Sequence, residues 1–485
     1  MESLPTASQH TIGAMLDTEL CWMPASQLAV AIKKKKVSPV EAVDAVLSRI
    51  EALPQVNAYC TVDADGARKT ARAAERALTK RGARLGPLHG VPFSVKDLVI
   101  TKGLRTTFGT PLYKDNVPDE DAPSVARMKA AGGILVGKTN TPPFGWIGIT
   151  DNLLFGVTRN PWGFDHTPGG SSGGAGAAVA AGLAPLAIGT DGGGSIRKPA
   201  AWCGIFGLKP SHGRIPVYPH AGVWSLSHLG PMTRTVLDAA LMMNVCAGPD
   251  ERDQFSLPAT GVNYVRAIEG SLKGLRVAYS DTLGFAPAVD PEVREATAKA
   301  ARAFRDFGCR VESVNPAWPS PYDCWRTTFY GGIATRLAPY RDRRGEIDPG
   351  LLAIVEEALA YPATKYVQAW IDRLAWWQHA RAFFERWDLL LTPAVACPPL
   401  RVGELYATEI GGAPVGREAG SAFTFAFNMT GQPAASVPCG VTKAGLPIGL
   451  QIVGRRFDDV TVLRASAAFE AARPWAHHRP PLLGS

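Results

Sequence analysis

Several motifs that would assign a function directly are missing from this 485-residue sequence. It has no G-x-x-x-x-G-K-[ST] run, which excludes a P-loop nucleotide site, and no H-E-x-x-H pair, which excludes that type of zinc site. The eight cysteines are few and lie at least 15 residues apart, so no C-x-x-C pair of ligands occurs. We therefore expect no metal site and no cofactor, and thiols that stay reduced in a cytoplasmic protein.

Long apolar runs and dense charge are also scarce. No apolar run reaches 18 residues and the N-terminus does not resemble a signal peptide, so we expect no membrane association and a cytoplasmic location. The formal net charge is +8, but the only dense basic run is the four lysines at 33–36, which we place at the C-terminus of a helix. Because nucleic-acid binding requires a basic patch, we expect no nucleic-acid partner.

The composition and the order of the predicted elements indicate one α/β domain. Hydrophobic residues make up 46% of the chain and charged residues 19%, which is typical of a globular protein with a large core. A capping box at 38–41 opens one helix, and residues 274–279, 291–307 and 310–314 read as strand, helix and strand. This alternation predicts a central sheet flanked by helices, and no linker or repeat divides residues 1–485.

An aromatic-rich stretch at 325–387 interrupts this alternation and reads as helical. It contains Tyr366, Trp370, Trp376 and Trp377 at mixed spacings, and we interpret most of these as core or helix-packing residues. If a cap covers an active site, we expect it to come from this stretch. A strand at 387–393 then returns to the sheet.

Two glycine-rich loops carry serines 24 residues apart, Ser171 in GGSSGG (169–174) and Ser195 in TDGGGSIR (190–197). Glycines leave room for a carbonyl to approach a hydroxyl, and their N–H groups can hold an oxyanion. Residues 174–183 read as a buried helix and 185–189 as a strand, so the chain can return one serine to the other. A tight structural turn explains each loop equally well when the loop is taken alone.

A lysine at the end of a predicted strand favours catalysis over a structural turn. Residues 91–98 read as a short apolar strand that ends near Lys96. Burial lowers the pKa of a lysine and so allows it to act as a general base. A surface lysine at a strand end is the common alternative.

A different hydrolase motif is also present, because residues 169–173 fit the G-x-S-x-G nucleophile elbow. That motif requires a strand running directly into it, whereas residues 159–168 read as a proline-bounded loop. A base would have to come from one of the histidines His166, His212, His220 or His228. The context argues against this alternative.

Lys96 and the two serine loops resemble the amidase signature family of serine hydrolases. The resemblance continues through KPAA (198–201), CGIFGLKP (203–210) and GLPIGLQ (445–451), and it covers residues 38–483, with 255–420 matching weakly. It implies one large domain with a central mixed sheet flanked by helices and a helical cap-like insertion. The core would be residues 38–250 and 388–483, and the variable, substrate-facing region 315–387.

The resemblance also implies a Ser–cis-Ser–Lys triad. Ser195 would be the nucleophile that forms an acyl-enzyme. Ser171, after a cis peptide bond from Gly170, would relay the proton, and Lys96 would be the base that accepts it.

The loop around the nucleophile would complete the site. The oxyanion hole would be formed by the N–H groups of Gly192, Gly193, Gly194 and Ser195. Gly192 replaces a bulkier residue of many relatives, but its N–H remains. Asp191 and Arg197 would brace the loop, and Ser172 and Thr190 would have supporting or structural roles.

Gly145 and Trp146 lie where the family places residues that face the acyl group, although a core or rim tryptophan is an equal alternative. With Trp146 in the pocket, we predict a hydrolase of hydrophobic or aryl amides, with esters or carbamates as further substrates. The partner would be a small-molecule amide, and the protein a monomer or homodimer. The alternative is the glutamine-hydrolysing A subunit of a tRNA-dependent amidotransferase, which typically carries an acidic, methionine-containing run at 139–146. Pro143 also departs from the glutamate of many free-standing relatives.

Overall fold

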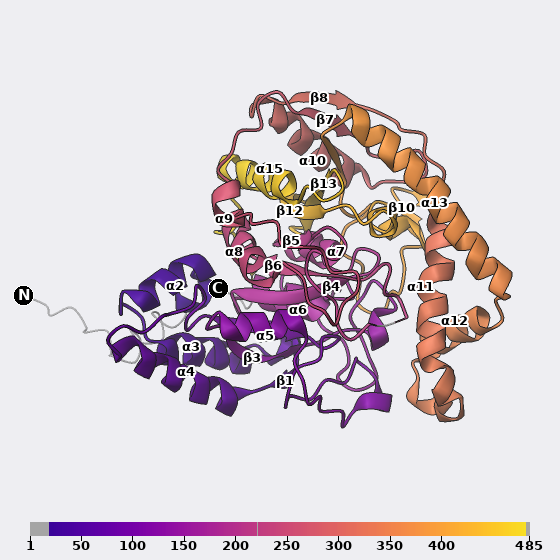
Figure 1. Ribbon diagram of the computed structural model, residues 1–485. Helices are drawn as coiled ribbons and strands as arrows, with labels where there is room; N and C mark the ends of the chain where they lie inside the picture. The colour runs from indigo at the N-terminus through magenta and orange to yellow at the C-terminus, as the bar shows by residue number, and fades with distance from the viewer. Residues whose placement is uncertain (1–18, 221, 482–485) are drawn as a thin grey trace, which may run out of the picture.

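An 11-stranded mixed sheet runs through the molecule (Figure 1), in a computed structural model that describes residues 19–220 and 222–481. Strands β2, β3 and β4 are parallel to one another, as are β7, β8 and β9, and the remaining pairs are antiparallel. Across the sheet the strands are β1 (Tyr59–Val62), β3 (Ile134–Thr139), β2 (Pro92–Lys96), β4 (Leu186–Asp191), β6 (His228–Thr233), β5 (Phe206–Lys209), β12 (Ala434–Val441), β13 (Pro447–Gly454), β9 (Leu389–Pro393), β7 (Arg276–Tyr279) and β8 (Arg310–Ser313). The predicted α/β class with a central mixed sheet is confirmed.

Helices flank the sheet along its whole length. They are α2 (Ala25–Lys33), α3 (Pro39–Ala52), α4 (Ala64–Thr79), α5 (Pro123–Ala130), α8 (Val236–Cys246), α9 (Tyr264–Ala267), α10 (Pro291–Arg302), α14 (Ala426–Met429) and α15 (Asp459–Ala472). The capping box predicted at the start of α3 is present, since Ser38 and Glu41 bond each other's backbone N–H groups. The lysines at 33–36 follow the end of α2, as expected.

Two short helices, α6 (Gly173–Ala180) and α7 (Arg197–Cys203), are buried against the sheet. Every residue of α6 is buried, and its small side chains allow close backbone packing. A Cβ at Gly174 would clash with the backbone of Asn140. Each helix begins directly after one of the two predicted serine loops. The predicted helix and strand between the serines correspond to α6 and β4.

Three helices form one side of the molecule, namely α11 (Tyr322–Leu337), α12 (Pro349–Leu359) and α13 (Ala363–Arg386) (Figure 1). They confirm the predicted helical insertion. The small hairpin of β10 (Glu409–Ile410) and β11 (Ala413–Pro414) follows later in the chain. The division into core and variable segments stays a prediction.

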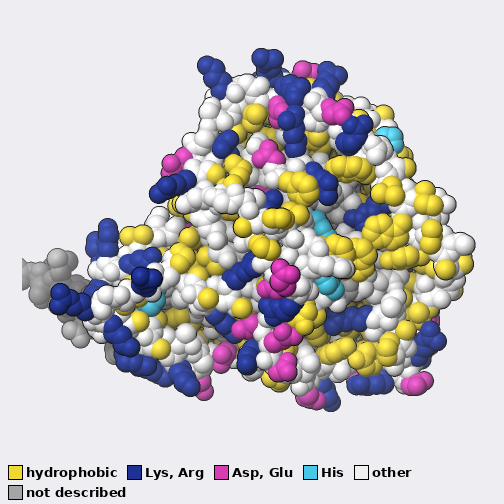
Figure 2. Space-filling view, viewed as in Figure 1, with side chains coloured by type: hydrophobic (Ala, Val, Ile, Leu, Met, Phe, Trp, Pro, Cys, Tyr) yellow, Lys and Arg dark blue, Asp and Glu magenta, His cyan; other side chains and the backbone are white. Residues whose placement is uncertain are grey.

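The charged side chains are dispersed. Figure 2 shows Lys and Arg side chains over much of the visible face, with acidic side chains among them. In the part of the chain that the structure describes, no helix has the length and apolar character needed to cross a membrane.

Candidate active site

Lys96 ends strand β2 with its side chain fully buried. Its Nζ lies 2.7 Å from the Oγ of Ser171 and 2.7 Å from the Oγ1 of Thr190. Burial lowers the pKa of Lys96 well below its usual value, and the negative charge of Asp191 only partly opposes this. The lowered pKa favours the neutral form of Lys96, which can accept a proton from the serine it contacts.

The structure brings the two predicted serines into one site. Ser171 and Ser195 line the same cavity, and the backbone N–H of Ser172 donates to the carbonyl oxygen of Ser195 at 3.1 Å. The peptide bond between Gly170 and Ser171 is cis, as the resemblance implied. Gly145 lies so close that a Cβ there would be 2.9 Å from the Oγ of Ser171.

Asp191 and Arg197 form a fully buried ion pair with a distance of 2.9 Å between Oδ1 and Nη2. Asp191 also accepts hydrogen bonds from the backbone N–H groups of Gly194, at 2.7 Å, and Ile196, at 3.1 Å. Burial opposes ionisation of Asp191, but the charge and hydrogen bonds of Arg197 outweigh it and hold the pKa below its usual range. The pair therefore fixes the loop that carries Ser195.

The hydrogen bond from Gly194 to Asp191 reduces the number of N–H groups available to the predicted oxyanion hole. Since the N–H of Gly194 already donates to Asp191, the N–H groups of Gly192, Gly193 and Ser195 remain as candidate donors. Gly194 has a φ of +124°, and a Cβ there would clash with the hydroxyl of Thr424, so this position requires glycine.

Ser172 and Thr190 join the two loops. The Oγ of Ser172 donates to the carbonyl oxygen of Thr190 at 3.0 Å and accepts from its N–H at 3.2 Å. The hydroxyl of Thr190 also contacts Lys96, so this residue lies closer to the reacting groups than the sequence indicated.

Sequence reasoning missed two amide side chains that complete the network. Asn428 donates to Asp191 at 2.8 Å, and Gln451 accepts from Arg197 at 2.8 Å. Both are fully buried. Gln451 ends the GLPIGLQ motif that carries the family resemblance, and Asn428 is a lone amide within an apolar segment, which are the signals that could have indicated them.

The rival nucleophile elbow does not form. Before Ser171, residues 159–170 contain only isolated bridges and no strand. His166 and His220 pair with acidic residues, and His212 and His228 bond backbone carbonyls. Within the described residues, no histidine lines a cavity that contains Ser195.

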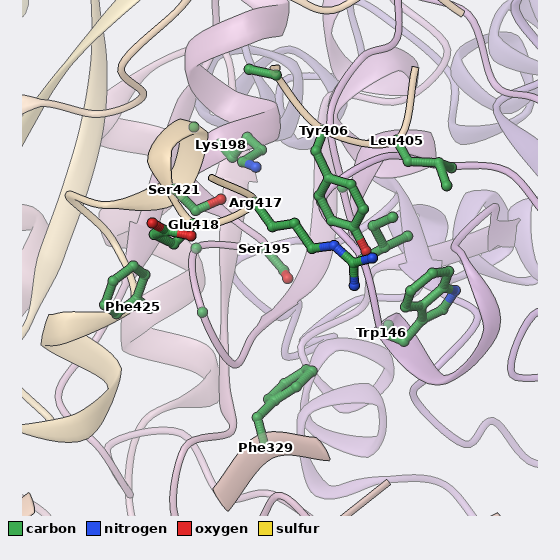
Figure 3. Close-up of a pocket in the computed structure, with 18 of the residues that line it drawn as sticks. Trp146, Ser195, Lys198, Phe329, Leu405, Tyr406, Arg417, Glu418, Ser421 and Phe425 are labelled. Atoms are coloured by element: carbon green, nitrogen blue, oxygen red, sulfur yellow. The ribbon is translucent and has the colours of Figure 1, made fainter. Parts of the chain in front are cut away.

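Two cavities meet at Ser195, and Gly145 and Phe329 also line both. We call the first the Trp146 pocket; its main lining side chains are Trp146, Lys198, Tyr322, Trp325, Phe329, Tyr330, Leu405, Tyr406, Arg417, Glu418 and Phe425. In Figure 3 the side chains of Trp146, Phe329, Tyr406 and Arg417 surround Ser195. We call the second the Arg336 pocket; besides Ser171 and Ser195 it is lined by Leu98, Phe108, Phe144, Tyr218, Val223 and Arg336.

The side chains of helix α11 leave no room for a residue larger than glycine at position 192. A Cβ at Gly192 would lie 2.9 Å from the ring of Phe329, and one at Gly193 would lie 2.6 Å from the ring of Trp325. The indole N–H of Trp325 donates to the carbonyl oxygen of Gly192 at 2.9 Å. The aromatic side chains of α11 therefore occupy the space beside the loop that a larger residue would need.

A protein-family model described as Amidase matches residues 41–463. The chain therefore belongs to the amidase signature family, whose members hydrolyse C–N bonds, and it is an amidase. An acylamidase of Rhodococcus erythropolis is 40% identical over 472 residues, which cover 96% of this chain and 98% of that protein.

Two further matches bear on the type of amidase. A crystal structure of a bacterial aryl acylamidase superposes with a TM-score of 0.88 at 34% identity, covering 94% of this chain and 97% of the other. The glutamyl-tRNA(Gln) amidotransferase A subunit of Geotalea daltonii is 36% identical over 496 residues, covering 96% of this chain and all of that protein.

Proposed function

We propose that this protein is a free-standing amidase that cleaves hydrophobic or aryl amides through an acyl-enzyme on Ser195. The contact between the Nζ of Lys96 and the Oγ of Ser171, both buried, carries the proposal. A neutral lysine beside a serine hydroxyl can draw a proton through that hydroxyl from a second serine in the same cavity.

The reaction follows from the positions of these groups. The hydroxyl of Ser195 attacks the amide carbonyl while its proton passes to Ser171, whose own proton passes to Lys96. The N–H groups of Gly192, Gly193 and Ser195 hold the oxyanion. Lys96 then returns a proton through Ser171 to the leaving nitrogen, the C–N bond breaks, and the amine departs. Water attacks the acyl-enzyme by the same route and regenerates Ser195.

The walls of both cavities support hydrophobic substrates. Tyr322, Trp325 and Phe329 stack in succession, with ring centroids 6.0 Å and 4.8 Å apart. Trp146 is 4% exposed and lines the same pocket. Aromatic walls of this kind favour an aryl or bulky apolar group over the polar side chain of glutamine.

The second candidate is the glutamine-hydrolysing subunit of a tRNA-dependent amidotransferase, which the identity to that subunit favours. The two functions differ in whether the chain acts alone. We would incubate the purified protein without partner chains with p-nitroacetanilide, a p-nitrophenyl carbamate and glutamine.

Release of nitroaniline or nitrophenol by the wild type, with glutamine inert, is the expected result. Turnover of glutamine alone, or no turnover until partner chains are added, would favour the amidotransferase function. Esters belong in the same series, because an acyl-enzyme on Ser195 forms from either substrate.

A further inference from the structure

Lys198 places a buried ammonium group in the wall of the Trp146 pocket. It is the second residue of α7, directly after the loop of Ser195, and its side chain is only 8% exposed. Its Nζ lies beside Gly148, where any Cβ would clash with it. The short helix therefore directs this side chain toward the space in which a substrate of Ser195 would lie.

Lys198 differs from the other buried lysines in having no acceptor. Lys96, Lys138 and Lys209 each donate to hydroxyls or backbone carbonyls. Within residues 19–220 and 222–481, no carboxylate lies within 4.0 Å of the Nζ of Lys198 and no hydrogen-bond acceptor is in reach. Its Nζ lies 5.4 Å from the centroid of the Trp202 ring and interacts electrostatically with the thiol of Cys397. Because Lys198 lines the Trp146 pocket, an anionic ligand in that pocket can supply the missing acceptor.

Besides Lys198, one cationic and one acidic side chain line the pocket. Arg417 lies over the ring of Tyr406 at 5.1 Å, and Glu418 is the one acidic side chain among the described lining residues. Among the described residues, Glu418 forms no ion pair with Lys198. Burial raises the pKa of Cys397 to about 12, so this lining thiol adds no negative charge at neutral pH.

The tyrosines of the pocket stay neutral for the same reason. Burial raises the pKa of Tyr322 to about 12 and raises those of Tyr330 and Tyr406 as well. The pocket wall thus carries two cationic side chains and one carboxylate, and Lys198 is the buried one of the two cations.

We propose that Lys198 binds a carboxylate of the substrate, so that the enzyme prefers amides carrying an anionic group on the part that enters the Trp146 pocket. This inference rests on the proposed function and narrows its substrate class to anionic aryl or alkyl amides. Trp146 and Phe329 provide apolar walls for the aryl or alkyl segment between the amide and the carboxylate. Burial lowers the pKa of Lys198 to about 8, so below that pH the ammonium form is available to pair with the anion.

The test uses two matched pairs of substrates. In 4-acetamidobenzoate and 4-methylacetanilide the carboxylate or methyl group is on the amine part. In N-phenylsuccinamate and N-phenylbutanamide the carboxylate or methyl group is on the acyl part. Arylamine release gives kcat/KM for each, and the ratio within a pair is compared between the wild type and Lys198→Met. This comparison cancels the intrinsic reactivity of each amide.

We expect the carboxylate-to-neutral ratio of one pair to fall roughly ten- to hundredfold in Lys198→Met, since a hydrogen bond to a charged group is lost. In the wild type the same ratio should fall as the pH rises through about 8, because Lys198 loses its charge. Ratios unchanged in both pairs, at every pH, would overturn the proposal. Arg417→Gln and Arg336→Gln are the matched controls, and loss of the preference in either, with Lys198→Met unaffected, would also overturn it.

Failure of the carboxylate site can be distinguished from failure of the proposed amidase function. Turnover of the neutral amides, lost in Ser195→Ala, tests the proposed function. Calorimetric binding of 4-acetamidobenzoate and N-phenylsuccinamate to Ser195→Ala, with and without Lys198→Met, tests the carboxylate site in the absence of turnover. If Lys198→Met does not fold, Lys198→Gln replaces it, and the pH dependence of the wild-type ratio still decides.

Discussion

The two sides of Ser195 differ in how their polar groups are satisfied. On the side of the sheet, one fully buried network is formed by Asp191, Arg197, Asn428 and Gln451. Asp191 pairs with Arg197, Asn428 donates a hydrogen bond to Asp191, and Gln451 accepts one from Arg197. On the side of α11, aromatic rings line the cavity and the ammonium of Lys198 has no acceptor. The satisfied side is suited to hold the reacting groups still, and the unsatisfied side is suited to receive a ligand.

The largest effect should come from the nucleophile itself. Ser195→Ala removes the atom that we propose forms the acyl-enzyme, so kcat on p-nitroacetanilide should fall about a thousandfold or more. Ser172→Ala is the matched control, because the hydroxyl of Ser172 bonds the backbone of Thr190, and its kcat should fall much less. Equal activity of the two variants would contradict the assignment of roles on the satisfied side.

The next effect tests the buried ion pair. Asp191→Asn leaves the charge of Arg197 buried without a partner, and the free energy of unfolding should fall by about 3–5 kcal/mol in urea denaturation. Asp44→Asn, which breaks an exposed pair with Arg68, is the control and should change stability little.

The same pair predicts a pH dependence of stability. Because the pKa of Asp191 is lower in the folded protein than in the unfolded chain, its contribution is complete above about pH 4 and is lost as the pH falls toward the folded pKa. Denaturation of the wild type should show this loss, and Asp191→Asn should lack it. Identical pH dependence in both proteins would mean that the pair does not stabilise the fold.

The pH dependence of kcat/KM tests the role of Lys96, and the expected change per pH unit is smaller than the loss in Ser195→Ala. Lys96 must be neutral to accept a proton, so kcat/KM for a neutral amide should fall about tenfold per unit as the pH drops below its pKa. Since burial lowers that pKa, the fall should begin well below the usual lysine range. A rate that is flat from pH 5 to pH 10 would argue against Lys96 as the base.

The smallest expected loss of activity comes from changing Gly192, where the loop of Ser195 contacts Phe329 of α11. Gly192→Ala would place a Cβ 2.9 Å from the ring of Phe329, and we expect kcat/KM to fall about tenfold or less. Combining it with Phe329→Leu should recover part of the loss and shift the preference among aryl amides. No recovery in the double variant would show that the two positions do not act on each other.

The sequence predicted the satisfied side well because its determinants are local. The run from 169 to 197 contains both serines, α6, β4 and the first residue of α7 in continuous chain, and the spacing alone indicates that the serines can meet. Asp191 and Arg197 are also close in sequence, at the two ends of the loop between β4 and α7. Asn428 and Gln451 reach the same network from distant elements, so only the tertiary structure reveals their partners.

The pocket was harder to predict because it is assembled from separate segments. Helix α11 supplies Trp325 and Phe329, as the expectation of a cap from 325–387 anticipated. Tyr406 and Arg417 come from loops within the segment predicted as core, and nothing in their local sequence marks them as pocket residues. Lys198 belongs to a motif that carries the family resemblance, yet its missing acceptor becomes visible only in the folded structure.

The central claim is that Ser195 carries the acyl group. The most direct measurement is intact-protein and peptide mass spectrometry after incubation with a p-nitrophenyl carbamate, whose carbamoyl-enzyme hydrolyses slowly enough to be isolated. We predict a single carbamoyl group on the peptide that contains Ser195, absent in Ser195→Ala. Carbamoylation of Ser171 or of another residue, or full labelling of Ser195→Ala, would contradict the account.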